Sequence, residues 1–222
     1  MTPGRAAGGQ ERSAGRQERA AGGQERPAGS TTRTQFDAVI LAGGQGRRLG
    51  GRDKAALPVA GRPMLERVLA GCTGAHQVVV AGPGPVPDGV LRVQEDPPGG
   101  GPVAGIVAAM AQVVSPWVLV LAVDQPDAAR AIPALLAALA ADPEADLLCQ
   151  RDGTGHPQWL LGAYRTAALR SVLAGVGGGH GVPVARVADG LRMVEVTDGA
   201  AHVGDVDTWA DHAAWEQRLS DR

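Results

Sequence analysis

The segment of this sequence best suited to chemistry is glycine-rich and cationic. It covers residues 41–54 and reads LAGGQGRRLGGRDK. Its five glycines permit positive φ angles and allow backbone N–H groups to approach a bound anion. Arg47 or Arg48 can place a guanidinium fork on phosphate oxygens, and Lys54 can supply a compact positive charge. Backbone amides combined with such side chains predict polyphosphate binding, with a plain basic surface loop as the alternative.

Two familiar phosphate-binding fingerprints are excluded in this segment. A Walker A loop needs a lysine directly after its second glycine, and here Arg52 follows Gly51. A dinucleotide fingerprint that begins at Gly44 needs glycine at position 49, which is Leu49. The sequence therefore argues against a P-loop NTPase and against a nicotinamide-dependent dehydrogenase.

A carboxylate, Asp124, ends the apolar run WVLVLAV at residues 117–123. A charge at the end of a buried strand is costly unless it faces a cleft or binds a cation. Mg²⁺ prefers one or two carboxylates together with substrate phosphates, so Asp124 is a candidate ligand, with a turn or helix cap as the alternative. Asp205 and Asp207 would add a second cation contact, although Asp207 also fits an ordinary helix N-terminus.

Three further features have two interpretations each. Asp96 precedes a Pro–Gly-rich turn, where it either caps a helix or contacts a ligand. His156 is either structural or a contact to a second substrate. The segment Gly175–Gly181 is either a loop over that substrate or a plain connector. Four tryptophans are expected in the core or in helix packing: Trp117, Trp159, Trp209 and Trp215.

Alternating strands and helices must position these residues. Short apolar runs predict strands at residues 36–42, 77–81, 90–94, 117–123, 145–149, 158–163 and 191–196. Helical spacing predicts helices at residues 63–72, 103–114, 131–141, 165–174 and 207–219. Continuous apolar strands between helices predict an α/β fold with a parallel sheet covered on both faces. Ligands in such folds bind beyond the carboxyl ends of the strands, where residues 43–54, 96–101 and Asp124 should meet.

Residues 1–35 differ in character from the rest. Residues 6–26 repeat the heptad AAGGQER, SAGRQER, AAGGQER, which has glycines and no large apolar side chain for a coiled-coil seam. We expect a disordered, low-complexity tail at 1–35 and one domain at 36–222. The tail has no apolar stretch that would make it a secretory signal.

Composition narrows the class of protein. The formal charge of −2 gives no global case for a nucleic-acid or membrane partner. Glycine and proline make up 49 of 222 residues, but no strict three-residue period exists, which excludes collagen. The uncharged stretch 97–123 is interrupted by Gly99–Gly101 and Pro116, which excludes a membrane span. Two lone cysteines, Cys72 and Cys149, fit a reduced protein, so a cytoplasmic location is expected.

Taken in order, these motifs resemble those of the molybdenum cofactor guanylyltransferase family, within the glycosyltransferase-A-like nucleotidyltransferases. Residues 41–54 resemble the family signature LAGGxxxRMGGxDK. The other similar segments are LPVAGRP at 57–63, ED at 95–96 with GPVAGI at 101–106, VLAVDQP at 120–126, HPQ at 156–158 and GDVDT at 204–208. The resemblance covers residues 36–219, which is nearly everything after the tail.

The resemblance implies a three-layer α/β sandwich with a mostly parallel, Rossmann-like sheet of the nucleotide-diphospho-sugar transferase type. It implies that Arg48, Lys54 and Asp124 act in catalysis. It implies a Mg²⁺ cofactor on Asp124, with Asp207 as a second contact. The nucleotide contacts that it implies are Leu41, Ala42, Gly43, Gly44, Lys54, Asp96 and Asp124.

The activity implied by the resemblance is transfer of GMP from GTP to a molybdopterin-type molybdenum cofactor. A terminal phosphate of the acceptor would attack the α-phosphorus in line, and pyrophosphate would leave. That phosphate is already an anion at pH 7, so catalysis would need positioning and charge stabilisation rather than a general base. The implied partners are GTP, the acceptor and molybdoenzyme maturation proteins.

The chain departs from the family pattern at two places. Ala81 stands where the family often has an asparagine after the second strand, and Asp205 and Asp207 stand where it often has asparagine. A base-contacting amide is thus missing, which leaves CTP open in place of GTP. A sugar phosphate or phospholactate acceptor, or a non-catalytic nucleotide-binding accessory protein, also remains open.

Overall fold

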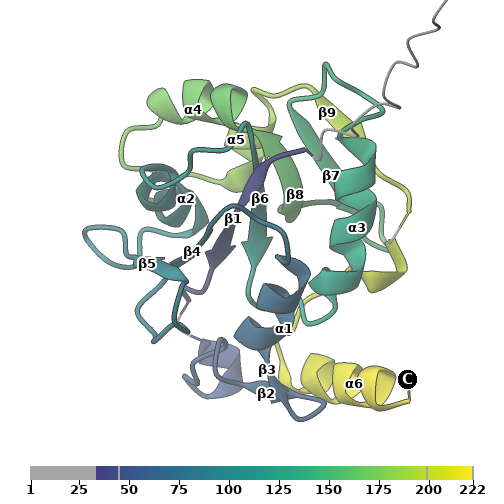
Figure 1. Cartoon of the computed structure of the whole chain (residues 1–222). Helices are drawn as coiled ribbons and strands as arrows, with labels where there is room; N and C mark the ends of the chain where they lie inside the picture. The colour runs from purple at the N-terminus through teal and green to yellow at the C-terminus, as the bar shows by residue number, and fades with distance from the viewer. Residues whose placement is uncertain (1–33, 45, 199, 222) are drawn as a thin grey trace, which may run out of the picture. The chain divides into compact units, whose positions relative to one another are not determined.

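The central sheet is built around β1 (Phe36–Leu41), the strand FDAVIL, which is buried along its whole length (Figure 1). The computed structural model describes residues 34–44, 46–198 and 200–221. Three further strands are parallel to β1: β4 (Val78–Ala81), β5 (Leu91–Val93) and β6 (Trp117–Ala122). β4 and β6 pair with β1 on its two sides, and β5 pairs with β4. Apolar runs buried on both faces are typical of parallel strands.

The other half of the sheet contains one reversed strand. The remaining strands are β7 (Leu147–Arg151), β8 (Pro157–Arg165) and β9 (Met193–Glu195). The seven strands run in the order β5-β4-β1-β6-β8-β7-β9, and β8 is antiparallel to both of its neighbours. The sheet is therefore mostly parallel, and β8 begins at the edge where the parallel strands end.

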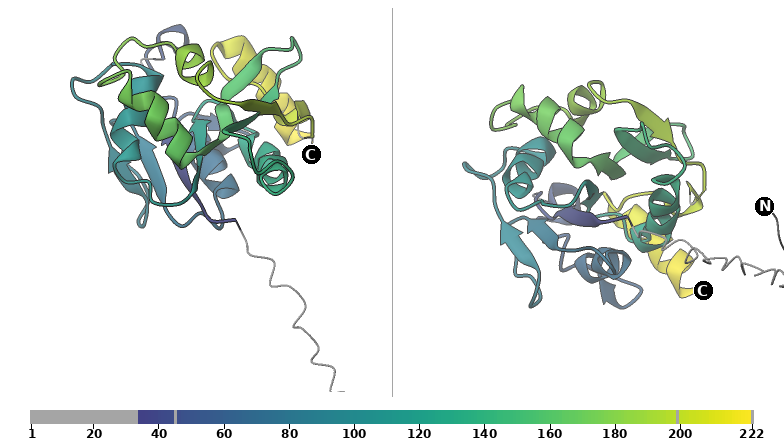
Figure 2. Two further views of the ribbon diagram at one scale, coloured as in Figure 1. Left: turned by 90° about the horizontal axis from the view of Figure 1, so that it is seen from above. Right: turned by 45° about the horizontal axis from the view of Figure 1, so that its top comes forward.

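Helices cover both faces of the sheet, which makes three layers (Figure 2). Phe36, Ala38 and Ile40 of β1 pack with α1 (Met64–Gly71) and α3 (Ala128–Ala138). Val39 and Leu41 face the opposite way, toward three helices: α2 (Pro102–Met110), α4 (Thr166–Ala174) and α5 (Val184–Ala188). The α/β three-layer sandwich expected from the sequence is confirmed.

A smaller cluster lies beside the main sheet. The hairpin of β2 (Pro58–Val59) and β3 (Arg62–Pro63) contacts α6 (Trp209–Ser220), which starts with a capping box between Thr208 and Asp211. Its buried side chains include Leu49, Val206 and Trp215. Leu49 belongs to the glycine-rich segment and Val206 lies between Asp205 and Asp207, so this cluster ties two candidate site loops together.

The expected elements are present with shifted ends. The second helix ends at Met110 rather than 114, and α3 begins at Ala128, three residues before the expected start, with Pro133 inside it. Three short elements were not expected as such: α5 and the 3₁₀ turns Arg47–Leu49 and Ala200–His202. Both cysteines are buried, and burial raises the pKa of the Cys72 thiol to about 12 and that of Cys149 to about 11.

The tail expected at residues 1–35 falls almost entirely outside the described residues, which begin at position 34. β1 begins at Phe36, one residue after the expected end of that tail. Within the described part of the chain, every helix is too short or too polar to cross a membrane.

The close approach of α1 to α3 depends on glycine at position 71. A Cβ on Gly71 would lie 2.6 Å from Ala129 Cα and 2.6 Å from Ile132 Cδ1. We expect Gly71→Ala to lower the free energy of unfolding by about 1–3 kcal/mol, because overpacking outweighs the better helix propensity of alanine. Urea unfolding measures the change. Gly153→Ala is the control, because a Cβ there meets nothing within 4 Å, and equal stability of the two variants would contradict the prediction.

A buried carboxylate, Asp37, stabilises the sheet at the amino end of β1, opposite the ligand edge. Asp37 is fully buried and accepts hydrogen bonds from Val114 N at 2.6 Å, Ser115 N at 2.8 Å and Ser115 Oγ at 2.8 Å. His76 Nδ1 lies 3.5 Å from Asp37 Oδ1. Burial alone would raise the pKa of Asp37, but these hydrogen bonds more than offset it, so the pKa lies below the ordinary value. The ionised form is therefore the one that stabilises the fold.

Asp37→Asn is expected to lower the free energy of unfolding at pH 7 by about 1.5–3 kcal/mol, because an amide cannot accept all three bonds as a carboxylate does. A depressed pKa contributes stability that is complete above the unfolded pKa and is lost as pH falls through the folded one. The difference between the two proteins should therefore be constant near neutrality and shrink below about pH 4. Chemical unfolding across pH tests this, and a difference that persists unchanged at pH 3 would contradict it.

Candidate active site

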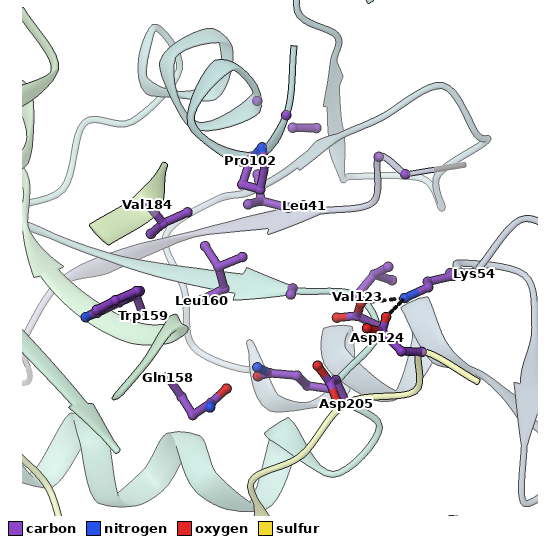
Figure 3. A pocket seen from close by; sticks show the side chains of 18 of the residues that line it. Leu41, Lys54, Pro102, Val123, Asp124, Gln158, Trp159, Leu160, Val184 and Asp205 are labelled. Atoms are coloured by element: carbon purple, nitrogen blue, oxygen red, sulfur yellow. Dashed lines mark hydrogen bonds and ion pairs between the residues drawn. The ribbon is translucent and has the colours of Figure 1, made fainter. Parts of the chain in front are cut away.

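A cleft of about 1180 Å³ opens at the carboxyl ends of the parallel strands. Leu41 and Gly43 line it at the end of β1, Asp124 at the end of β6, and Pro102 at the start of α2. Trp159 lines it from the start of β8, because that strand is reversed (Figure 3). The loops expected to meet at this edge do meet there, except that Asp96 does not line the cleft and its neighbour Glu95 does.

Lys54 is held between two carboxylates on the floor of the cleft. Its Nζ donates to Asp124 Oδ2 at 2.8 Å and to Asp207 Oδ1 at 2.6 Å (Figure 3 shows the contact to Asp124). Burial of this side chain, which is 15% exposed, would lower its pKa, but the charges of Asp124 and Asp207 and their hydrogen bonds raise it overall. The ammonium is thus charged and held in one place at neutral pH. We call Lys54, Asp124 and Asp207 the lysine clamp.

The local backbone explains how Lys54 reaches this position. Gly46 has φ +51°, and both Leu49 N and Gly51 N donate to its carbonyl oxygen. A Cβ at position 46 would lie 2.3 Å from the carbonyl oxygen of Arg52, so only glycine closes this loop. Leu49, the residue that breaks the dinucleotide fingerprint, is fully buried and anchors the loop from below.

The acidic side of the cleft is formed by two segments that are far apart in the sequence. Val206 is fully buried and its N–H donates to the carbonyl oxygen of Asp124 at 2.9 Å. This bond brings Asp205 and Asp207 beside Asp124. Desolvation, followed by the neighbouring charges of Asp124 and Asp207, raises the pKa of Asp205. The site therefore carries more negative than positive charge around Lys54.

The remaining residues expected to bind nucleotide fall into two groups. Leu41, Gly43 and Gly44 line the cleft, and Arg48 lies at its rim with Nη1 3.7 Å from Asp207 Oδ2 and a side chain that is 75% exposed. Ala42 instead lines a smaller adjoining cavity of about 300 Å³. Gln45 lies outside the described residues, and the Arg47 side chain is likewise not described.

The far end of the cleft is lined by two aromatic residues, Trp159 and His156, and the sequence did not single out Trp159 as a site residue. Trp159, expected in the core or in helix packing, is half-buried: it packs against the core cluster that contains Val39 and Leu41, and it also lines the cleft. Trp209 is 47% exposed, and Trp117 and Trp215 are buried as expected. His156 also lines the cleft. Gly175–Gly181 is outside the cleft lining and contacts the loop before α2, where His180 Nε2 lies 2.9 Å from the carbonyl oxygen of Pro97.

Two features near the clamp were not used in the prediction, and one of them, the single lysine, is visible in the sequence. Lys54 is the only lysine among the 222 residues, although the chain has twenty arginines, so this position keeps lysine where all other basic positions use arginine. Gln125 directly follows Asp124, is 3% exposed and lines the cleft. Its Oε1 is buried and has no hydrogen-bond partner within the described part of the chain.

Comparisons with known proteins agree with this architecture. The molybdenum cofactor guanylyltransferase of Acidiphilium cryptum is 36% identical over 188 residues, which are 81% of this chain and 93% of that protein. The crystal structure of molybdopterin-guanine dinucleotide biosynthesis protein A from Archaeoglobus fulgidus matches 84% of this chain and all of its own, with TM-score 0.63 and 20% identity. The 2-C-methyl-D-erythritol 4-phosphate cytidylyltransferase from Thermus thermophilus gives TM-score 0.65 at 21% identity, with the same shares covered.

Fold and sequence together define the class of protein. The two solved structures share the three-layer fold of this chain, which is that of the nucleotide-diphospho-sugar transferases. This chain is an enzyme of the nucleotidyltransferase type. The family model of the MobA-like NTP transferase domain matches residues 38–191. The chain belongs to the MobA-like NTP transferase family.

Proposed function

We propose that this enzyme transfers GMP from GTP to a molybdopterin-type molybdenum cofactor and releases pyrophosphate. The observation that carries the proposal is the lysine clamp at the ligand edge of the sheet, next to a loop of glycine amides. The relative from Acidiphilium cryptum is named a molybdenum cofactor guanylyltransferase, which supports the choice of donor and acceptor. The cleft also exceeds the range of about 300–1,000 Å³ common for a single small ligand, so it has room for two substrates.

The residues of the cleft suit in-line phosphoryl chemistry. Amides of Gly43 and Gly44 would hold the phosphates, and Lys54 would offset the charge that grows on the α-phosphate as it is attacked. An oxygen of the acceptor phosphate forms the new bond to the α-phosphorus, and the bond to the β-phosphate oxygen breaks. Arg48, exposed at the rim, has the freedom to turn onto the leaving pyrophosphate.

The acidic residues fit a magnesium ion. Among the described residues no three His, Cys, Asp or Glu side chains form a ready-made metal cage. Mg²⁺ does not require such a cage, because it is commonly bound by one or two carboxylates and completed by substrate phosphates and water. The Val206 N–H bond to the Asp124 carbonyl oxygen brings Asp205 and Asp207 beside Asp124, and such an excess of negative charge favours a cation. Asp124 would hold the ion with Asp207 as a second ligand, and bound Mg²⁺ would neutralise phosphate charge.

The test is a pyrophosphate-release assay with the full chain. GTP, CTP, ATP and UTP are each supplied with molybdopterin carrying molybdenum, with and without Mg²⁺. We expect release with GTP, in the presence of both acceptor and Mg²⁺. Release with CTP instead would replace guanylyl by cytidylyl transfer, a choice that Ala81 makes worth testing because it offers no amide to the base. Absence of release with all four nucleotides would overturn the proposal.

A further inference from the structure

The two ends of the cleft differ in charge. Near Lys54 and Arg48 the lining offers two cations and glycine amides, which suit phosphates, and the carboxylates of Asp124, Asp205 and Asp207, which suit a metal ion. At the far end, in the described lining residues from Asp152 to Val184, there is no lysine or arginine. The side chains there are largely uncharged and flat or apolar: Trp159, Pro157, Leu160 and Val184. A second triphosphate would therefore be poorly stabilised at this end, whereas an uncharged ring would be well placed.

Trp159 is held as a rigid platform. The buried Tyr164 donates from its hydroxyl to the Trp159 carbonyl oxygen at 2.7 Å, which fixes the backbone of this residue. The His156 ring meets the indole edge to face, with centroids 5.1 Å apart and an interplanar angle of 68°. Aromatic pairs favour this geometry, so His156 supports the orientation of the indole. An indole that is fixed before binding loses little conformational freedom when a ligand stacks on it.

Gln158 adds a directional polar group beside the platform. Its Nε2 donates to Asp152 Oδ2 at 2.9 Å, and Asp152 is itself held by Thr154 N, Thr154 Oγ1 and His156 N. These hydrogen bonds, with that from Thr154 Oγ1 first, lower the pKa of Asp152, which keeps it an acceptor. Since Nε2 is used, the oxygen of Gln158 is the group that remains; it accepts no hydrogen bond from the described residues. In Figure 3, Trp159 and Gln158 lie across the cleft from Lys54 and Asp124.

We infer that Trp159, with Gln158, forms the subsite for an uncharged, planar heteroaromatic group of the acceptor, which stacks on the indole and donates an N–H to the Gln158 oxygen. This inference rests on the proposed function, because a pterin is such a group and a phosphate on its far side would point toward the clamp. Trp159 is thus a specificity-determining residue for the acceptor, and the nucleotide does not use it.

Two measurements on full-length variants test the subsite. In the pyrophosphate assay, Trp159→Ala should raise the KM for the acceptor at least about tenfold, as loss of one stacking partner does for nucleobases, with the KM for GTP within twofold. Trp159→Phe keeps a flat ring and should stay within about threefold of the parent. Gln158→Leu keeps the volume and should raise the acceptor KM alone. Trp209→Phe is the matched control at an exposed tryptophan away from the cleft lining.

The second measurement does not depend on turnover. Isothermal titration calorimetry with 6-hydroxymethylpterin, an uncharged pterin, should give a Kd at least tenfold weaker for Trp159→Ala than for the parent and for Trp209→Phe. Near-ultraviolet circular dichroism and urea unfolding establish that the variants are folded. Pterin binding that depends on Trp159, in a protein that releases no pyrophosphate, would support the subsite while overturning the proposed function.

Three outcomes would overturn the subsite. One is an unchanged acceptor KM and an unchanged pterin Kd in Trp159→Ala. Another is no pterin binding to the parent at millimolar concentration together with an unchanged acceptor KM. The third is a raised KM for GTP with an unchanged KM for the acceptor, which would place the nucleotide base on Trp159. In each case normal pyrophosphate release by the parent would leave the proposed function intact.

Discussion

Replacing Lys54 with methionine is expected to lower the rate of pyrophosphate release by about 10²–10³-fold, the usual cost of removing one preorganised electrostatic group from a reaction centre. The methionine side chain keeps the length and removes the charge. Lys54 makes 2.8 Å and 2.6 Å contacts to its two carboxylates, so its position is set before substrate arrives. The loss should appear in kcat more than in the KM for GTP, because the charge on the α-phosphate grows only as the bonds rearrange.

The control for this variant is Arg62→Met, which removes an exposed cation that lies 3.6 Å from Glu66 on the β3–α1 segment. A surface pair of this kind contributes little, so turnover should stay within about twofold. Urea unfolding of both variants separates a catalytic loss from a folding loss. If folded Lys54→Met turned over within tenfold of the parent, the catalytic assignment of the lysine clamp would be wrong.

The second large effect is expected at Asp124. Asp124→Asn keeps the shape of the side chain and removes the negative charge, and we expect a fall in turnover of about 10²–10³-fold with the fold intact. Raising the Mg²⁺ concentration should restore part of the rate, because a weakened ligand set is filled again by mass action. Asp88→Asn, at an exposed turn, is the control. Its rate should depend on the Mg²⁺ concentration in the same way as the rate of the parent.

Combining the two changes shows whether Lys54 and Asp124 act as one unit. Their side chains touch, and residues of one catalytic group give strongly non-additive losses. The double variant should therefore lose much less than the product of the two single losses. Full multiplication of the effects would show two independent roles, and near-parent turnover in Asp124→Asn alone would remove the carboxylate from the mechanism.

The sequence predicted the strongest strands because their signal is local. β6 is apolar over its whole length and β1 at every position but Asp37, and the residues that follow them, Gly43 and Asp124, could be placed at the ligand edge from strand direction alone. The direction of β8 was not predicted, since an apolar run carries no information on direction. A signal did exist: only five residues separate β7 from β8, and a parallel partner needs a crossover of a dozen or more.

That reversal also explains what the sequence analysis missed in the site. In a wholly parallel sheet Trp159 would begin its strand at the opposite edge from the ligand, and a core position was the sensible expectation. Because β8 is antiparallel, Trp159 and His156 stand at the ligand edge instead. Asp207 as a partner of Lys54 was equally hidden, since the two are 153 positions apart in the sequence and tertiary packing, in which Val206 is buried, brings them together. The preference for Glu95 over Asp96 depends on loop geometry that spacing does not encode.

The single lysine has a practical consequence for work on this enzyme. A reagent that acylates side-chain amines finds one target in the whole sequence, and that target lies in the cleft. In the free protein its two carboxylate partners and raised pKa leave little unprotonated amine to react. A ligand that draws Asp124 or Asp207 away should speed acylation, and one that covers Nζ should slow it. At most one side-chain label can be added to each chain. The fraction of chains whose intact mass has increased by that label then reports how accessible Lys54 is in the clamp.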